Sequence, residues 1–291
     1  MAGPNVTEKC SNGRCEIPAG SFQMGSTEGD PDEQPVRTVA MTGFQLGQME
    51  VSVDDYQAYL VGTAGVQLSA VIAGCGTSGT SRTIAAHKGE TKGQLRERAA
   101  QMVVGESCNV MQVVESTPSG MPDFPENKKG GNYPVVALTM DEKRAYCQAQ
   151  GGDLPTAAQL HYASRFDDQD SATGDLVISD HVFRSDDGFR SAEPVNGGYK
   201  DRFGVYNLFG NVWESTLDAY DKDFYARMAS QNPYNPLTNP WSPLNRNGQL
   251  EEFSGGSFNL IDWYARSANR GNDSPDNHHR NVGFRCAWPL P

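Results

Sequence analysis

Short hydrophobic runs alternate with polar, glycine-rich segments in the first part of the chain. Two of these runs, residues 16–26 (EIPAGSFQMGS) and 36–52 (VRTVAMTGFQLGQMEVS), are typical of strands, and an acidic loop that contains proline separates them. Over residues 54–61, hydrophobic side chains recur at helical spacing: Tyr56, Tyr59 and Leu60. The pattern therefore predicts two strands and a helix, preceded by a loose N-terminal tail over residues 1–15.

The segment from residue 63 to 132 has the least regular pattern in the chain. It is rich in Gly, Ser and Thr, and one part of it, residues 91–104, has hydrophobic side chains at helical spacing: Leu95, Ala99 and Met102. We interpret residues 63–132 as a long insertion in a single domain that spans residues 16–291.

Regular patterns return at Tyr133. The run YPVVAL, residues 133–138, predicts a buried strand. Thr139 and Glu142 then form the T-x-x-E pattern of a capping box, in which the hydroxyl and the carboxylate each bind a free backbone N–H at the start of a helix. The expected inward positions of this helix are Ala145, Tyr146 and Ala149, and the helix should end at Gly151.

A second helix is predicted to start after Thr156, which can serve as its N-cap. Its inward side chains would be Leu160, Tyr162 and Ala163. After Arg165 the pattern is mostly irregular, with short strand candidates at residues 205–210 (VYNLFG) and 211–215 (NVWES). Long irregular stretches are uncommon in compact domains unless they are functional.

Composition excludes some classes of function. The formal net charge is −12 and the pI is near 4.8, so the surface repels phosphate backbones and we predict no nucleic-acid partner. No run reaches the roughly 20 hydrophobic residues of a membrane helix, and the polar start fits a cytosolic protein or a mature chain.

The six cysteines show no CxxC spacing, which favours disulfides and an oxidising compartment over zinc. The candidate pairs are Cys10–Cys15 and Cys75–Cys108.

The stretch from Gly255 to Cys286 is regular at its ends and irregular in its middle. GGSF opens it and NVGFRC closes it, and three clusters without any period lie between them: Asn259–Tyr264, Gly271–Asp273 and His278–Asn281. Loops held on a rigid scaffold are common binding sites. We therefore predict that residues 255–286 contain a recognition surface.

Six motifs occur in a fixed order along the chain: IPAGSFQMGS, DEQPVRTV, FQLGQMEVSVDDYQAYL, YPVVALTMDEKRAYCQAQGGDLPTAAQLHYASR, VYNLFGNVWE, and GGSF with NVGFRCA. In this order they resemble the formylglycine-generating-enzyme-like superfamily, over residues 16–61 and 133–287. The resemblance implies an α+β domain with an elaborated C-type lectin fold and much irregular structure. It also implies a disulfide between Cys147 and Cys286, and in some relatives a calcium ion near the segment that contains Glu214.

The catalytic branch of this superfamily oxidises a sulfatase cysteine with two cysteines that bind copper. The matching positions here are Leu260 and Ala265, and neither can act as a thiolate. We therefore expect no enzyme activity and no cofactor. For Glu214 two roles are expected as alternatives: a ligand of a structural calcium ion, or a buried structural carboxylate. The alternative function is an oxidoreductase of the formylglycine-generating or sulfoxide-synthase kind with an altered site.

The last segment also resembles the variable proteins of diversity-generating retroelements, of the treponemal variable surface lipoprotein type. These carry RSANR-like motifs and end in GFR, and their variable residues arise by mutation of adenines in Asn codons. Between Asn259 and Asn281 there is no Lys, Met, Gln or Glu, the residues that such mutation does not produce, and Trp263 is the one exception to the accessible set. The resemblance implies display on a bacterial surface, with a possible N-terminal lipid anchor as the only link to a membrane.

We expect the ligand to be a macromolecule, protein rather than glycan, because exposed aromatic and aliphatic side chains anchor protein partners. The predicted ligand-binding positions are Asn259, Leu260, Ile261, Asp262, Tyr264, Gly271, Asn272, Asp273, His278 and His279. A buried strand over residues 260–264 is the alternative, and Trp263 is equally consistent with support and with contact. The adjacent histidines should point to opposite sides, so we predict no metal there.

Three arginines in and beside the same stretch are expected to hold its loops through hydrogen bonds to carbonyls and carboxylates: Arg266, Arg270 and Arg285. Gly255 and Gly256 are expected to adopt backbone conformations that other residues rarely reach.

Overall fold

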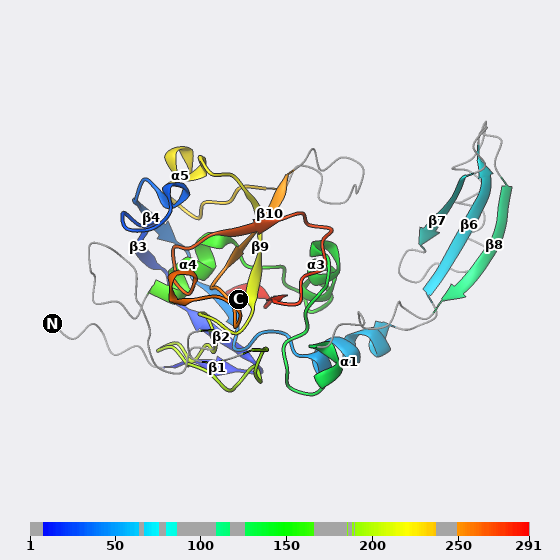
Figure 1. Ribbon diagram of the computed structural model, residues 1–291, viewed down its shortest axis with the longest axis horizontal. Coiled ribbons are helices and arrows are strands. Elements are labelled where there is room, and N and C mark those ends of the chain that lie inside the picture. Colours follow the sequence, from blue (N-terminus) through cyan, green and yellow to red (C-terminus); the bar gives the residue numbers. More distant parts are fainter. Residues whose placement is uncertain are drawn as a thin grey trace. The chain divides into compact units, whose positions relative to one another are not determined.

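The chain forms two compact units in the computed structural model, one of residues 1–56 with 122–291 and one of residues 57–121. Figure 1 shows the order of the elements. No helix in the described part of the chain has the length and hydrophobicity needed to cross a bilayer. The structure describes residues 8–63, 67–75, 80–85, 109–116, 126–165, 185, 188, 190–236 and 249–290.

One sheet of the larger unit brings the two ends of the chain together. Its order is β1 (Cys10–Ser11), β2 (Arg14–Ile17), β5 (Phe44–Gly47) and β13 (Ala287–Pro289). Strands β1 and β2 form a hairpin whose two turn residues, Asn12 and Gly13, both have positive φ, as a tight turn of this length requires. A disulfide joins Cys10 to Cys15 across the hairpin. The prediction of a loose tail is therefore wrong from Cys10 onward.

Each of the two predicted N-terminal strands is in fact two strands in different sheets. The first run divides into β2 and β3 (Gly20–Met24), and the second into β4 (Arg37–Met41) and β5. Strands β3 and β4 form a separate two-stranded sheet, and Ala40 of β4 also forms a bridge with Gln231. The breaks fall at Pro18 and at Gly43; proline cannot donate to a ladder and glycine weakens a strand.

A second sheet carries the predicted recognition segment. Its order is β11 (Gly271–Asp273), β10 (Leu250–Ser254), β9 (Trp213–Tyr220) and β12 (Val282–Gly283), with β12 parallel to β9. The candidate strand at residues 211–215 is the start of β9. The candidate at residues 205–210 is not a strand, because the backbone has positive φ at Asn207 and at Gly210.

The helices confirm most of the sequence predictions. Helix α1 covers Val53–Thr63, α3 covers Met140–Ala149 and α4 covers Ala157–Arg165. Both halves of the capping box of Thr139 and Glu142 are present at the start of α3. Short helical turns follow elsewhere: η1 (Pro31–Glu33), η2 (Asn127–Lys129), α5 (Phe224–Arg227) and η3 (Asp262–Tyr264).

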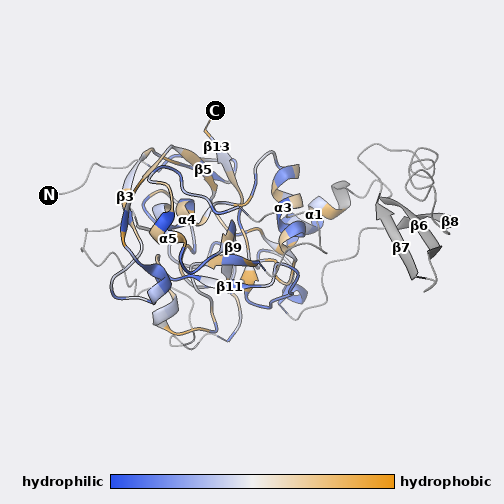
Figure 2. Ribbon diagram, turned by 90° about the horizontal axis from the view of Figure 1, so that it is seen from above, coloured by the Kyte–Doolittle hydropathy of each residue, from blue (hydrophilic) through white to orange (hydrophobic). Residues whose placement is uncertain are grey.

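Two details near α3 differ from the prediction. Residues 133–138 are buried but form no strand: the N–H of Val135 donates to Val51, that of Ala137 donates to His279, and φ at Ala137 is 62°. The inward face of α3 holds Lys143 and Cys147 as well as Tyr146, whereas Ala149 is exposed. Hydrophobic and hydrophilic residues accordingly alternate along α3 in Figure 2.

Helix α4 lies within the main hydrophobic core, in contact with β3, β9 and β10. Leu160, Tyr162 and Ala163 are all buried, as predicted. The Tyr162 ring contacts the ring of Phe22, with centroids 5.3 Å apart. This packing fixes β9 and β10, the strands from which the recognition segment extends.

The smaller unit contains a three-stranded antiparallel sheet in the order β7 (Thr80–Ala85), β6 (Gln67–Cys75) and β8 (Asn109–Ser116). The sequence pattern did not predict these strands, because Gly, Ser and Thr reduce the hydrophobic alternation on which strand prediction depends. The predicted helix over residues 91–104 and a Cys75–Cys108 bridge lie outside the described residues.

Candidate functional site

The recognition segment starts at two glycines whose backbone conformation no other residue could easily adopt. Gly255 has φ of 95° and Gly256 has φ of 76°. A Cβ on Gly255 would lie 2.8 Å from the carbonyl oxygen of Leu208, and a Cβ on Gly256 would lie 2.6 Å from that of Tyr264. Both steric and conformational limits therefore favour glycine here, as predicted.

Three buried arginine–carboxylate pairs hold the segment against the rest of the fold. Arg266 donates to Glu33 with Nη2–Oε1 of 2.7 Å, and Arg270 donates to Glu252 with Nη2–Oε2 of 2.6 Å. Arg285 donates through Nε to Oε2 of Glu214 at 2.6 Å. Bidentate pairs of this kind fix geometry as well as charge. The predicted supporting role of these arginines is confirmed.

Hydrophobic side chains project from the loop between these supports. The exposed fraction is 50% for Ile261, 43% for Trp263 and 37% for Tyr264, and Asn259 is also exposed. We call Asn259, Ile261, Trp263 and Tyr264 the contact surface. Among the described residues the other large exposed hydrophobic side chains are Tyr234 and Leu290, so three of the five lie in this one loop. The alternative of a buried strand over residues 260–264 is therefore wrong.

Trp263 is both exposed and held in place. Its carbonyl accepts a hydrogen bond from Nε of Arg266 at 2.7 Å, and the guanidinium of Arg266 lies 4.5 Å from the centroid of its ring. The cation–π contact and the buried Glu33 partner of Arg266 limit the movement of the indole. The side chain of Asp262 lies outside the described residues.

The two positions that match catalytic cysteines face inward. Leu260 is half-buried against Trp213, Phe253 and Val282, and Ala265 is 5% exposed within the main core. These residues have no thiol, so they cannot ligate copper in the manner of the catalytic branch.

The other predicted positions lie on β11 and the loop after it. Gly271 and Asp273 are half-buried and Asn272 is exposed. His278 is exposed, with Nδ1 2.6 Å from the carbonyl oxygen of Ala137. His279 is half-buried, with Nε2 3.0 Å from Oδ2 of Asp273, and burial lowers its pKa.

Loop 259–264 is joined to the histidine loop by a polar contact. Nδ2 of Asn281 donates to Oδ1 of Asn259 at 3.0 Å and to Oγ of Ser257 at 3.1 Å. The predicted clusters at residues 259–264 and 278–281 are therefore neighbours in space.

The residues present do not fit a calcium ion held by Glu214. Arg285 occupies both carboxylate oxygens of Glu214, and burial raises the pKa of that carboxyl. Glu214 is thus a buried structural carboxylate, which was one of the two predicted roles. Across the described ranges no group of three or more His, Cys, Asp or Glu side chains is placed to hold a metal.

Sequence reasoning missed a buried lysine below the segment. Lys143 is 1% exposed, its Nζ donates to Oγ of Ser215 at 2.6 Å, and it lies 3.5 Å from Oε1 of Glu251. Burial lowers the pKa of Lys143. Cys147 lies one helical turn further along the same face of α3. The disulfide that the resemblance implies for Cys147 requires this face to point inward, so it could have predicted that Lys143 is buried.

A buried histidine network also escaped prediction. His161 on α4 has Nδ1 3.2 Å from Oη of Tyr225 and Nε2 3.2 Å from Oγ of Ser254. All three residues are buried, so the network links α4 to β10 directly below Gly255 and supports the loop from inside.

Comparison with known proteins identifies the sequence family and the fold. The family model for the sulfatase-modifying factor enzyme 1-like domain matches residues 4–290. A formylglycine-generating enzyme of Streptomyces coelicolor is 28% identical, over 98% of this chain and 92% of its own. An inactive C-alpha-formylglycine-generating enzyme 2 of Bos taurus is 26% identical, over 94% of this chain and 86% of its own.

Among solved structures, Treponema denticola variable protein 1 has a TM-score of 0.60 at 15% identity, covering 95% of each chain. At this identity the likeness shows the fold alone. The predicted α+β fold of the formylglycine-generating-enzyme-like, C-type lectin type is confirmed. The Cys147–Cys286 disulfide is also present.

The expectation that the chain is not an enzyme is contradicted. Relatives that match it over nearly their full length are named formylglycine-generating enzymes, so the sequence family is an enzyme family, although it includes proteins named inactive. The expectation relied on two positions, Leu260 and Ala265, where the catalytic branch has cysteines. The absence of cysteine at these two positions does not by itself decide whether a member of the family is active.

Proposed function

This chain belongs to the sulfatase-modifying factor enzyme 1-like domain family, and on that premise we propose that it binds a protein ligand through the contact surface. The observation that carries the proposal is the exposure of Ile261, Trp263 and Tyr264 on one loop. Large hydrophobic side chains cost free energy when they stay in water, and their burial by a partner recovers it at about 25 cal/mol per Å².

A protein ligand fits this surface better than a glycan. Aromatic residues surrounded by polar groups form the usual centre of protein interfaces. Trp263 is already held by Arg266, so little side-chain entropy would be lost when a partner covers it. Asn259 and His278 would supply polar contacts at the rim.

We further propose that the surface is diversified by a retroelement. In support, residues 259–281 lack Lys, Met, Gln and Glu, and the side chains at most predicted variable positions are exposed or half-exposed on a backbone fixed by buried arginines. Genome sequence tests this directly. We expect a near-copy of the codons for the last segment, which lies beside a reverse transcriptase gene and differs at adenines. A genome with no such copy contradicts the proposal.

Display on a bacterial surface through a lipid anchor is part of the same proposal.

Selection from a random peptide library displayed on phage tests the binding function. Peptides enriched on the wild-type protein should bind it and should lose at least tenfold in affinity on a triple variant, Ile261→Ser, Trp263→Ala and Tyr264→Ala. Tyr234→Ala is the matched control, because Tyr234 is 40% exposed outside the contact surface. If enriched peptides bind the triple variant as tightly as the wild type, the contact surface is not the binding site.

An oxidoreductase with an altered site is the second candidate function. The relatives named formylglycine-generating enzymes favour it. Purified protein would be analysed for bound metal and then incubated with a cysteine-containing sulfatase peptide while oxygen consumption and peptide mass are measured. Oxygen uptake with formation of an aldehyde in the peptide supports this function, and an unchanged peptide mass contradicts it.

A further inference from the structure

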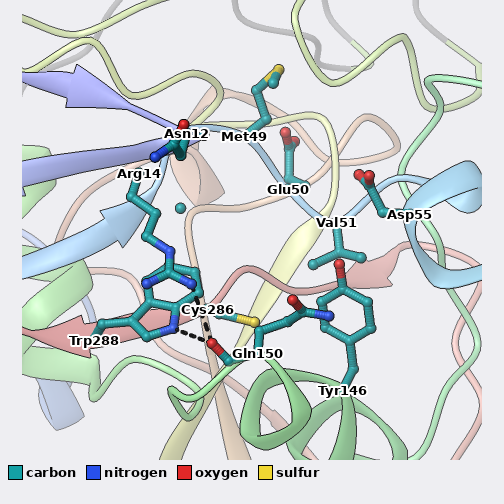
Figure 3. A pocket seen from close by; sticks show the side chains of 12 residues that line it. Asn12, Arg14, Met49, Glu50, Val51, Asp55, Tyr146, Gln150, Cys286 and Trp288 are labelled. Atoms are coloured by element: carbon teal, nitrogen blue, oxygen red, sulfur yellow. Dashed lines mark hydrogen bonds between the residues drawn. The ribbon is translucent and has the colours of Figure 1, made fainter. Parts of the chain in front are cut away.

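A pocket of about 250 Å³ lies in the larger unit, and none of its lining residues belongs to the contact surface (Figure 3). Its walls come from the turn between β1 and β2, the segment after β5, the first turn of α1, the end of α3 and the β13 region. The disulfides Cys10–Cys15 and Cys147–Cys286 cross-link the elements that form these walls. The pocket therefore has a fixed frame.

One side of the pocket carries a fixed positive charge. The guanidinium of Arg14 lies 3.9 Å from the centroid of the Trp288 ring. Nη2 of Arg14 and Nε1 of Trp288 both donate to the carbonyl oxygen of Gln150, at 3.2 and 3.1 Å. A guanidinium has five N–H donors and this contact uses one of them, so Arg14 retains donors for a carboxylate.

The other side carries two acidic residues, Glu50 and Asp55. In Figure 3 the side chains of Glu50 and Asp55 lie across the pocket from the guanidinium of Arg14. Asp55 is exposed and held in place, because its Oδ2 accepts a hydrogen bond from Oγ of Ser52 at 2.6 Å. Glu50 is 2% exposed, and its two carboxyl oxygens accept from the side-chain amides of Asn207 at 3.1 Å and Asn211 at 2.9 Å, so Asp55 is the acid that faces the pocket with an exposed side chain.

Met49, Val51 and Cys286 add hydrophobic surface to the lining of the pocket. A ligand of single charge would meet the like charge of one side as well as the opposite charge of the other. A ligand with separated charges of both signs would satisfy each side. We propose that this pocket binds a small zwitterion of the size of a free amino acid or a dipeptide, with its carboxylate at Arg14 and its ammonium group facing Asp55.

Calorimetric titration of the disulfide-intact chain with four probes tests the proposal: dialanine, L-alanine, N-acetyl-dialanine and dialanine amide. At least one of the two zwitterions should saturate the protein at millimolar concentration or below. The acetylated probe, which lacks the ammonium group, and the amide, which lacks the carboxylate, should both bind at least tenfold more weakly than dialanine or not at all.

Two variants locate the site. Asp55→Asn and Arg14→Gln should each weaken the zwitterion about tenfold, and Asp54→Asn should leave binding unchanged, because Asp54 is an exposed acid on the same helix outside the pocket. Asp55→Asn keeps the acceptor for Ser52, so it tests the charge even if Arg14→Gln unfolds. Absence of binding by both zwitterions, equal binding of the capped probes, or equal loss in the Asp54 control would each overturn the proposal.

Discussion

Arg266 and Glu33, which are 233 residues apart in sequence, form a buried ion pair directly behind the exposed ring of Trp263. Glu33 is fully buried, and both of its carboxylate oxygens accept from the guanidinium, at 2.7 and 2.9 Å. The acidic loop near the N-terminus thus positions the contact surface near the C-terminus.

Removal of this pair's carboxylate should destabilise the protein and loosen Trp263. Glu33→Ala leaves the Arg266 charge buried without its main partner, which typically costs about 3–5 kcal/mol. Chemical denaturation measures the loss, and the mobility of Trp263, one of four tryptophans, follows from the part of the fluorescence anisotropy signal that a Trp263→Phe substitution removes. Glu28→Gln is the control, because Glu28 is an exposed acid on the same loop. Equal effects of the two substitutions would contradict the assigned role of Glu33.

The two disulfides should differ in their contribution to stability because they close loops of different length. Cys147–Cys286 joins residues 139 apart, whereas Cys10–Cys15 joins residues 5 apart. Loop-closure entropy predicts a loss of about 3–5 kcal/mol for the double change Cys147→Ser and Cys286→Ser, and about 2 kcal/mol or less for Cys10→Ser and Cys15→Ser. Urea unfolding of both variants makes the comparison, and a larger loss in the short loop would be the contrary result.

Gly256→Ala should destabilise the start of the recognition segment by about 1–3 kcal/mol, because the new Cβ adds a steric clash to an unfavourable φ. The clash is with the carbonyl oxygen of Tyr264, at 2.6 Å. Gly130→Ala separates the two causes: φ there is 63° but nothing lies within 4 Å of an added Cβ. Thermal unfolding should show the larger loss at Gly256, and equal losses would remove the steric part of the explanation.

The contribution of two buried carboxyl groups, Glu50 and Asp218, to stability should fall as the pH rises from about 4.5 to about 7. Burial raises the pKa of Glu50 from 4.5 to about 7, and burial together with Glu252 raises that of Asp218 from 3.8 to about 7. Between the unfolded and folded pKa values the folded state binds more protons than the unfolded state, so each increase in pH favours unfolding, and the effect levels off above about 7. Melting temperatures measured across this range should fall, and Glu50→Gln should reduce the slope. If the melting temperature of the Glu50→Gln variant fell with pH as steeply as that of the wild type, the raised pKa of Glu50 would be contradicted.

The parts of the fold that depend on local chemistry could be predicted from the sequence. The capping box at Thr139 and Glu142 needs only neighbouring residues, and the positive φ of Gly256 likewise follows from its local backbone, although its clash with Tyr264 does not. The division of residues 16–26 between β2 and β3 could not be read, because both strands share the same hydrophobic alternation and only their partners differ. The arginines could be assigned a supporting role, but their carboxylate partners could not, since Glu33 and Arg266 meet only after folding.

Part of the candidate site was also predictable. The mixed composition of residues 259–264 indicated exposure, and Ile261 and Tyr264 are exposed. Leu260 lies half-buried in the same run, packed against Trp213, Phe253 and Val282, which are distant in sequence. Lys143 is buried in polar contact with Ser215 and Glu251, which are distant in sequence. The spacing of hydrophobic residues along a helix does not predict such contacts.

Hydrogen exchange on a complex with a library-selected peptide tests the central claim most directly. Saturating peptide should slow exchange of backbone amides in residues 257–266 by at least tenfold, with little change at Tyr234, because the contact surface would be covered by the ligand. Protection confined to other parts of the chain, with residues 257–266 exchanging at the unliganded rate, would contradict the claim that this loop is the binding site.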